Sequence, residues 1–397
     1  MTQAKRAVNP ALVTLALAMG AFAIGTAEFA AMSLVPFFAA DLHIDEPAAG
    51  HAISAYALGV VVGAPVIAVL AARVARRTLL MGLMALFAIG NGLSALAPSY
   101  HALLLFRFLA GLPHGAYFGV AALVAASMVP PNRRALSVAR VMTGLTVATI
   151  IGVPLANFLG QMFGWRLGFA VVAALALVTM ALVGLYAPHG ETSKEASPLR
   201  ELDALKRPQV LLTLLTGAIG FGGLFAVYTY AASTLMAVTR VSEVWVPLVL
   251  AVFGAGMTIG NLVAGWAADR RLNATAIVLM LWTAIALALF PASAGNVWTL
   301  SADIFFIGCG GGLGTVLQTR LMDVAGDAQA LAAAAHHSAF NIANALGPWL
   351  GGLAIGAGFG FTSTGWIGAA LSLGGLAVFL LALALQRRGS ARIATLA

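Results

Sequence analysis

The chain has 397 residues, of which 61% are hydrophobic and 9% are charged, and its formal net charge is +8. An ordinary soluble domain is about 45–50% apolar and about 25% charged. This composition therefore excludes a water-soluble globular protein and indicates that lipid faces much of the chain. The single cysteine, Cys309, excludes an intramolecular disulfide.

The apolar residues fall into twelve continuous runs. A helix needs about 20 apolar residues to cross about 30 Å of hydrocarbon, and continuous runs exclude the alternating pattern of transmembrane strands. Lys5 and Arg6 precede the first run as in a signal peptide, but the run is long and similar runs follow, so we interpret it as a retained span. In chain order we expect helices near Ala11–Phe38, Ala49–Ala71, Thr78–Ala97, Ala102–Met128, Ala135–Met162, Leu167–Ala187, Val210–Met236, Val244–Ala267, Ala274–Ala292, Val297–Thr319, Ala328–Gly356 and Thr364–Leu385.

Basic residues gather in alternate breaks between these runs. If the N-terminus is cytoplasmic, the cytoplasmic breaks hold all of the 21 basic residues except Arg107, Arg166 and Arg240. This bias satisfies the positive-inside rule and predicts an even number of spans, with both termini on the cytoplasmic side of a bacterial-type inner membrane. Because the charge is dispersed over short breaks rather than gathered in a groove, it argues against a nucleic-acid partner.

The longest polar stretch divides the runs into two sets of six. We expect an N-terminal six-helix bundle at 1–187, a cytoplasmic linker with a short amphipathic helix at 188–208, and a C-terminal bundle at 209–397. Three pairs of residues hold corresponding places in the two halves at nearly equal separations, namely Ala72 and Asp269, Arg107 and Asp303, and Gly152 and Gly347. This spacing indicates an internal duplication, an arrangement in which transporters bind their solute at the midplane between the halves.

Four local motifs are informative. The break after the second run of the second half reads Gly265-Trp266-Ala267-Ala268-Asp269-Arg270-Arg271, and the first half keeps Arg73, Arg76 and Arg77 there but lacks the acid. The fourth run contains Arg107-Phe108-Leu109-Ala110-Gly111-Leu112-Pro113-His114-Gly115. The fifth run of each half carries Gly152-Val153-Pro154 or Gly347-Pro348-Trp349-Leu350-Gly351-Gly352, and Gly164-Trp165-Arg166 precedes the sixth run.

With these motifs the whole chain resembles the major facilitator superfamily. Within it, the chain is similar to the drug:proton antiporter branch, near the arabinose-type sugar efflux and chloramphenicol exporter proteins. The resemblance implies an all-α membrane protein of twelve helices in two pseudo-symmetric six-helix bundles. It also implies a cytoplasmic latch, in which Asp269 meets the positive N-terminus of the fifth helix near Arg133, Arg134 and Arg140. Because the first half lacks the acid, Asp323 and Asp327 could pair with Arg73, Arg76 or Arg77 instead.

The candidate proton-coupling residues are Glu28, Arg107, His114 and Asp303. Glu28 is the one acid of the first run, and a carboxylate in hydrocarbon is costly enough to be protonated often, whereas a nearby guanidinium opposes protonation. Glu28 and Arg107 are therefore a plausible switch, although Glu28 could also lie at the periplasmic rim. His114 follows Arg107 by two turns and faces the cavity or is a structural histidine. Asp303 is a second protonation site, a partner of Arg107 or a residue near the periplasmic mouth.

The candidate solute-binding residues lie mainly on the eleventh run. His337, Asn341 and Asn344 follow the i, i+4, i+7 spacing of one helix face, which indicates a solute pathway or hydrogen bonds between helices. Tyr228, Tyr230 and Asn261 are further candidates for the same cavity. Gly111, Gly115, Gly152, Pro154, Gly347 and Pro348 are candidates for close packing and for hinges, because small residues let helices touch and proline bends them.

These patterns predict a secondary transporter rather than an enzyme. The chain contains no Walker loop, His-Glu-x-x-His or nucleophile elbow, so we expect no cofactor and no metal. The predicted partners are a small-molecule substrate, protons and the lipid bilayer, and the predicted protein is a monomer. We expect proton-coupled efflux by alternating access, with a facilitator, a proton symporter or a non-transporting sensor as alternatives. The sequence leaves sugars, amphenicols, purines and cationic drugs open as substrates.

Overall fold

The computed structural model describes residues 9–44, 46–71, 73–188, 206–242, 245–326 and 329–394. Throughout these ranges the regular structure is helical, and eleven helical segments are long and apolar enough to cross a membrane. The predicted all-α membrane class is therefore confirmed. The predicted linker helix falls mostly at 189–205, outside the described residues, so the domain boundaries stay a prediction.

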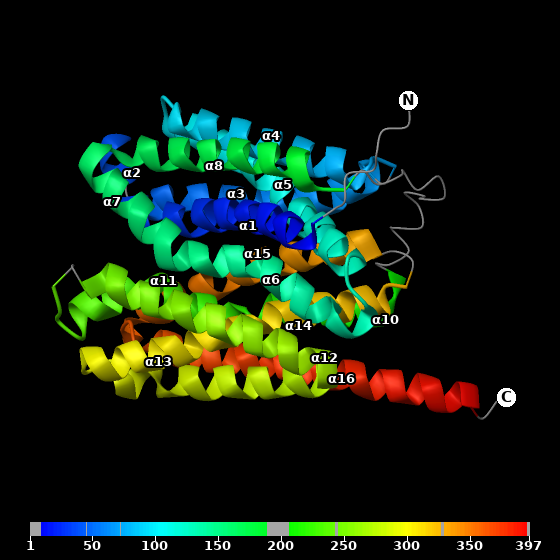
Figure 1. Cartoon of the computed structure of the whole chain (residues 1–397). Helices are drawn as coiled ribbons and strands as arrows, with labels where there is room; N and C mark the ends of the chain where they lie inside the picture. Colours follow the sequence, from blue (N-terminus) through cyan, green and yellow to red (C-terminus); the bar gives the residue numbers. More distant parts are fainter. Residues whose placement is uncertain are drawn as a thin grey trace, which may run out of the picture.

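The first half holds six membrane passes (Figure 1). Asn9 caps the start of α1 by accepting a hydrogen bond from Ala11 N at 3.0 Å, and Ser99 caps α5 in the same way. Gly164 takes a φ of 92° at the sharp turn before α8. The first predicted run is broken after Ser33, so α2 is a separate short helix. The elements are α1 (Pro10–Ser33), α2 (Val35–Asp41), α3 (Glu46–Leu70), α4 (Arg76–Ala95), α5 (Tyr100–Ser127), η1 (Pro131–Arg133), α6 (Arg134–Val147), η2 (Ala148–Gly152), α7 (Val153–Phe163) and α8 (Trp165–Tyr186).

The second half follows the same plan. Its elements are α10 (Pro208–Gly220), α11 (Gly222–Ala237), α12 (Trp245–Ser293), α13 (Val297–Cys309), η4 (Gly310–Gly312), α14 (Leu313–Val324), α15 (Gln329–Ala354), η5 (Ile355–Phe359) and α16 (Ser363–Ala394). Proline lies inside several of these helices, as neighbouring membrane helices tolerate it.

Helix α12 crosses the membrane twice. Arg271 alone has a non-helical backbone (φ −147°, ψ 70°), and the chain reverses there. The two limbs, 245–270 and 272–293, return to the same end, where Thr239 donates to Ala294 O at 2.8 Å and the rings of Trp245 and Trp298 lie 5.6 Å apart. With α12 counted as two passes, the described chain makes the twelve passes expected.

The two halves have the same internal packing. In the first half, Gly59 and Gly63 of α3 and Gly111 of α5 sit so close to the facing helix that an added Cβ would meet the backbone oxygens of Phe108, Leu112 and Tyr56. In the second half, Gly256, Gly260 and Gly308 make the same approaches to Phe305, Cys309 and Phe253. This correspondence supports the predicted internal duplication.

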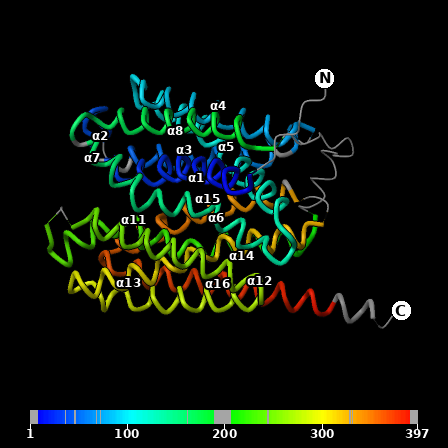
Figure 2. Tube along the Cα trace, viewed as in Figure 1, coloured from blue at the N-terminus to red at the C-terminus, as the bar shows by residue number. Residues whose placement is uncertain are grey.

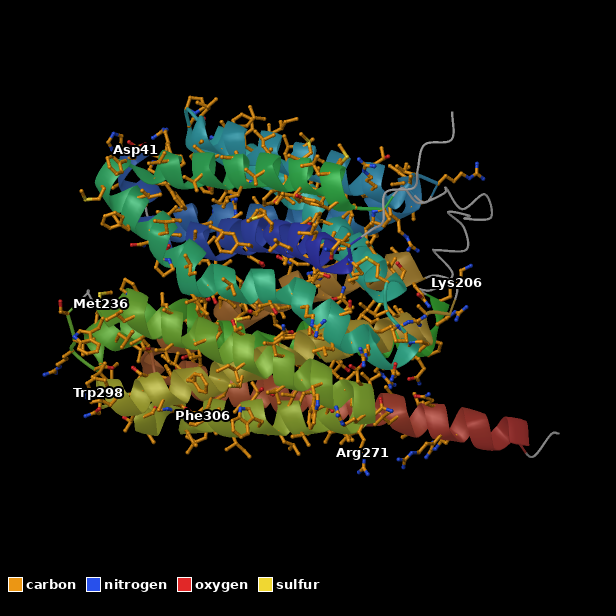
Figure 3. The ribbon with its side chains drawn as sticks, in the orientation of Figure 1. Asp41, Lys206, Met236, Arg271, Trp298 and Phe306 are labelled. Atoms are coloured by element: carbon orange, nitrogen blue, oxygen red, sulfur yellow. The ribbon has the colours of Figure 1, made fainter. Side chains whose placement is uncertain are left out.

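The halves lie side by side and meet along two seams (Figures 1 and 2). One seam joins α15 to α3 and α5, and the other joins α6 and η2 to the first limb of α12. The start of α1 and the end of α16 lie at one end of the molecule, together with Lys206 and Arg271 (Figures 1 and 3). We call this the basic end, and the end that carries Asp41, Met236 and Trp298 the opposite end.

Candidate functional site

Glu28 links the two halves. Its side chain is 2% exposed, between one and two turns before the end of α1. Oε1 accepts a hydrogen bond at 3.3 Å from Asn344 Nδ2 of α15, whereas Oε2 has no protein partner. Glu28 is therefore buried against the other half rather than open at the rim.

Arg107 is held inside the first half. Its guanidinium donates to Ala27 O at 3.3 Å and to Asn91 Oδ1 at 3.5 Å, and it lies 4.4 Å from the ring centroid of Tyr56 and 5.1 Å from that of Phe169. Arg107 makes no direct ion pair with Glu28, although the two charges interact at longer range. Because two rings and two neutral acceptors already hold the guanidinium of Arg107, the carboxylate of Glu28 is not bound to it and can change partners.

Two histidines face each other across the α5–α15 seam. His114 and His337 are 0% and 5% exposed, and their ring centroids are 5.5 Å apart. His114 Nδ1 shares a hydrogen bond of 2.8 Å with Tyr56 Oη, and the ring of His337 stacks on Phe118 at 4.3 Å with an interplanar angle of 10°. His114 thus belongs to the same polar cluster as Tyr56 and Arg107.

Unpartnered polar atoms concentrate around these residues. Buried polar groups normally have hydrogen-bond partners, and an unsatisfied one costs about 1–3 kcal/mol. The described side chains include buried nitrogen or oxygen atoms that lack a partner in Glu28, Arg107, His114, Gln318, His337, Asn341 and Asn344. Three of these residues, His337, Asn341 and Asn344, form the predicted polar face of α15, and its role in solute binding stays a prediction.

Three predicted site residues lie elsewhere. Asp303 accepts from Ser293 Oγ at 3.0 Å within its own half and does not meet Arg107. Tyr230 donates to Pro348 O at 3.0 Å and so points into its own half. Asn261 bridges the other seam, donating to Ala139 O at 2.9 Å and accepting from Thr315. Of the two predicted tyrosines, only Tyr228 faces the first half, with its ring 5.6 Å from that of Phe29.

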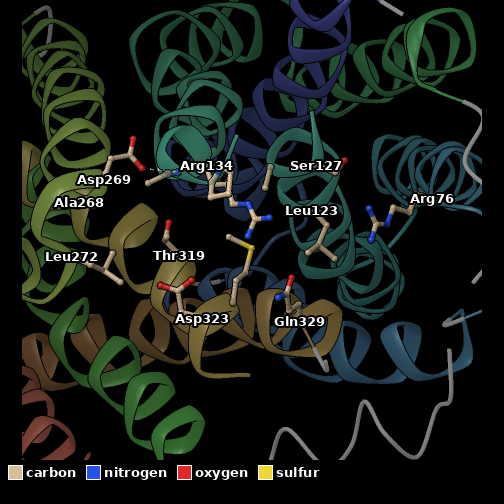
Figure 4. A pocket seen from close by; sticks show the side chains of 14 residues that line it. Arg76, Leu123, Ser127, Arg134, Ala268, Asp269, Leu272, Thr319, Asp323 and Gln329 are labelled. Atoms are coloured by element: carbon tan, nitrogen blue, oxygen red, sulfur yellow. Dashed lines mark hydrogen bonds between the residues drawn. The ribbon is translucent and has the colours of Figure 1, made fainter. Parts of the chain in front are cut away.

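Asp269 lies at the start of α6. Its carboxylate oxygens accept from the backbone N–H groups of Ala135 at 3.1 Å and Leu136 at 3.3 Å, so an acid of the second half caps a helix of the first. Beside this contact, at the basic end, is a pocket of about 310 Å³ (Figure 4). Arg76, Arg134, Asp269, Asp323 and Gln329 line it together with apolar residues.

The other predicted latch residues lie in both halves. Asp323 interacts electrostatically with Arg134 and Arg320, and Asp327 lies outside the described residues. Arg77 donates to Gly184 O within the first half, and Arg270 stacks on Trp266 at 3.9 Å. Arg73 and Arg76 are exposed at the basic end, where Arg76 reaches the pocket.

The predicted hinge residues pack mostly within their own halves. An added Cβ would meet Thr26 at Gly152 and Gly222 O at Gly347, both inside the same half. The seam contact instead involves Gly115 and Gly119, where an added Cβ would lie 3.2 Å from Ala334 O and 2.9 Å from Ala334 N. Pro154 follows a π-helical turn, η2, because its ring and missing N–H disturb the helix one turn earlier.

Sequence reasoning missed several buried polar residues. Tyr56 and Asn91 hold Arg107, and no motif marks them. Arg320 counted as a loop charge, yet it is 3% exposed and donates to Thr213, Asn273, Gln209 and Gln386. A polar residue inside an apolar run, or directly after one, was the available sequence signal for each of them.

A polar clamp closes the opposite end of the first half. Arg166 pairs with Asp41 and also donates to Ala97 O at 3.1 Å, while Trp165 Nε1 donates to Asp41 at 3.1 Å. The hydrogen bond from Arg166, followed by that from Trp165, holds the pKa of Asp41 below its ordinary value. The clamp therefore fixes α2 on the start of α8.

Comparisons with known proteins give consistent matches. The family model "Major Facilitator Superfamily" matches residues 17–319 and 232–396. The chain is 41% identical over 377 residues to the inner membrane transport protein YdhP of Escherichia coli strain K12, covering 94% of this chain and 96% of that protein. It is 34% identical over 350 residues to a chloramphenicol resistance protein of Streptomyces lividans, covering 86% and 88%.

The fold matches a solved transporter. The structure of the proton:xylose symporter XylE, bound to 6-bromo-6-deoxy-D-glucose, aligns with a TM-score of 0.73 at 18% identity, covering 93% of this chain and 94% of that one. At this identity the match concerns the fold alone.

Proposed function

Because the chain belongs to the Major Facilitator Superfamily and is a multi-pass membrane transporter of small solutes, we propose that it exports a small organic solute in exchange for protons. The relative named as a chloramphenicol resistance protein supports export as the direction. The two halves rock about a central site that opens to one side of the membrane at a time.

The contact between Glu28 and Asn344 carries the proposal. The one acid of α1 reaches the opposite half at 3.3 Å while its second oxygen stays unpartnered. An ionised carboxylate accepts a stronger hydrogen bond than a neutral one, so ionised Glu28 favours this contact. Protonation weakens the contact and releases α15, which makes the proton a ligand for one arrangement of the halves.

Arg107 opposes the protonation of Glu28. Burial among apolar groups favours the protonated form of Glu28, whereas the permanent positive charge of Arg107 favours the ionised form, so Glu28 can bind and release a proton during the cycle. A tenfold proton gradient is worth about 1.4 kcal/mol and a charge crossing 100 mV about 2.3 kcal/mol. Together these are sufficient to move a solute uphill.

Asp269 provides the matching gate at the basic end. Its two hydrogen bonds to the start of α6 hold that end closed. The seam residues Gly115 and Gly119 close the same side of the bundle against α15. We propose that the positive-inside pattern places this end in the cytoplasm, with both termini, and that the protein works as a monomer.

Transport in proteoliposomes tests the proposal. With an imposed pH gradient, an antiporter moves its solute toward the acidic compartment against a concentration difference. Movement of solute and protons in the same direction would identify a symporter instead. Flux that ignores the pH gradient would identify a facilitator, and a folded protein that moves no solute would identify a sensor.

A further inference from the structure

The α5–α15 seam contains hydrogen-bonding groups that proton coupling does not use. His114 Nε2 and both ring nitrogens of His337 are buried and have no protein partner, and the two rings belong to different halves. We infer that His114 and His337 together bind a hydroxyl group of a neutral solute, and that Tyr56 is the positioning residue that fixes His114 for this purpose. The inference rests on the proposed function and names the chemistry of its solute.

Tyr56 determines which nitrogen of His114 carries the proton. The guanidinium of Arg107 lies 4.4 Å from the centroid of the Tyr56 ring, and a cation over a phenol ring draws electron density from it, which makes the hydroxyl a better donor. Tyr56 Oη therefore donates to His114 Nδ1 across 2.8 Å. A neutral imidazole that accepts at Nδ1 carries its proton on Nε2, so His114 presents an N–H donor to the seam.

His337 supplies the complementary acceptor. A neutral imidazole has one donor and one acceptor nitrogen. The parallel stack on Phe118, at 4.3 Å and 10°, covers one face of the ring and leaves the nitrogens to bond in the ring plane. The seam thus offers an N–H from the first half and an acceptor nitrogen from the second.

A hydroxyl group satisfies this pair, because it accepts one hydrogen bond and donates another. A carboxylate can accept from the N–H of either ring but leaves the acceptor nitrogen of His337 without a donor, and an ammonium group has no lone pair for His114. The surrounding charges point the same way: Arg107 disfavours a second cation, and Glu28 disfavours an anion. Phe118 and Phe340, whose rings lie 4.3 Å and 6.4 Å from that of His337, provide an apolar surface for the remainder of the solute.

Because His114 belongs to the first half and His337 to the second, a solute bound by both residues connects the halves during transport. A hydroxyl bound by both rings holds α5 against α15, and rocking of the halves must break at least one of its two bonds. Solute and proton then act on neighbouring contacts of the same helix, since Asn344 lies two turns beyond His337 on α15.

Matched solutes test the inference. Purified protein in liposomes is assayed with two matched pairs and one cation. The first pair is thiamphenicol and florfenicol, in which fluorine replaces one hydroxyl of thiamphenicol, and the second is D-glucose and 2-deoxy-D-glucose. The cation is tetraphenylphosphonium, which has no hydroxyl. We expect transport of a hydroxylated member with a KM about 3- to 10-fold lower than that of its partner lacking the hydroxyl. Transport of tetraphenylphosphonium alone would overturn the inference while leaving proton exchange intact. Flux of a hydroxylated solute that ignores an imposed pH gradient would instead contradict the proposed proton exchange and leave the inference intact.

Substitutions of His337 and Tyr56 test whether these residues cause the preference for a hydroxylated solute. His337→Leu should abolish the preference for the hydroxyl, whereas His337→Gln, which keeps a donor and an acceptor, should retain most of it. Tyr56→Phe should reduce the preference several-fold and change the ¹⁵N signals of His114, which report the tautomer. His101→Leu is the matched control, because His101 is exposed at the start of α5, and this variant should leave the preference unchanged. A preference that persists in folded His337→Leu would refute the inference.

Discussion

Tyr56 and Phe253 are equivalent residues of the two halves. The backbone oxygen of Tyr56 is approached by Gly111, and that of Phe253 by Gly308 in the same way. Only Tyr56 has a hydroxyl, which reaches His114, and only its ring lies under a guanidinium. The first half therefore holds the buried charged groups, and the second half supplies aromatic and amide side chains that face them.

Glu28→Gln should separate exchange from proton coupling. Glutamine keeps an oxygen that accepts from Asn344 but cannot bind or release a proton. We expect uphill efflux driven by a pH gradient to fall at least about tenfold, and solute counterflow to stay within about twofold. Radiolabelled solute uptake in proteoliposomes measures both. Asp303→Asn is the comparison, because Asp303 contacts Ser293 in its own half; equal losses in both variants would contradict the assignment to Glu28.

Arg107→Lys should destabilise the first half although the charge is kept. A lysine ammonium cannot cover two rings and reach both Ala27 O and Asn91 at once. We expect a loss of about 1–3 kcal/mol in unfolding free energy, measured as a lower melting temperature in detergent. Arg166→Lys serves as the control, since Arg166 also stacks on a ring, Trp165 at 4.3 Å, but is 40% exposed. Similar shifts in the two variants would argue against the proposed packing of Arg107.

Asp269→Asn should open the basic end. Losing the charge at the start of α6 costs about 1 kcal/mol, which corresponds to about fivefold in the open population. Ser127→Cys, placed in the pocket wall in a Cys309→Ser background, reports opening through its rate of maleimide labelling. Arg388→Gln on the exposed end of α16 controls for charge. An unchanged labelling rate in Asp269→Asn would show that the carboxylate does not hold the gate.

Asp41→Asn should lower stability in a pH-dependent way. The pKa of Asp41 is depressed by Arg166 and Trp165, so its stabilisation is present above the ordinary aspartate value and disappears as the pH falls through the lower folded value. The pair is 40% and 46% exposed, which limits the effect to about 0–1 kcal/mol. Melting temperatures should differ slightly at pH 7 and converge toward pH 3. A difference that grows on acidification would reverse the expected sign.

The sequence predicts the membrane architecture well, because hydropathy alone determines where a helix can leave water. It also marks Glu28, Arg107 and the polar face of α15 as polar groups within membrane spans, and the structure buries them. The break between α1 and α2 escapes prediction because both sides of it are apolar. The reversal at Arg271 without a loop likewise depends on one backbone conformation that no residue pattern specifies.

The partners of the candidate residues are harder to predict than their burial. Tyr228 and Tyr230 are two residues apart, so helical geometry turns them to different sides, and only one faces the other half. Arg320 is one turn from the end of α14, where hydropathy cannot distinguish a loop cation from one enclosed by amides. Tertiary packing decides both cases.

Arg271 joins the two limbs of α12 without a flexible connection. The first limb carries Asn261 and Asp269, which contact the first half, and the second limb presents Ile285 and Leu289 outward to the acyl chains. The first limb also exposes apolar side chains, such as Val263, so a movement that breaks the contacts of Asn261 and Asp269 changes how the whole of α12 meets the acyl chains. We expect the thickness and lateral pressure of the bilayer to influence the speed of the transport cycle.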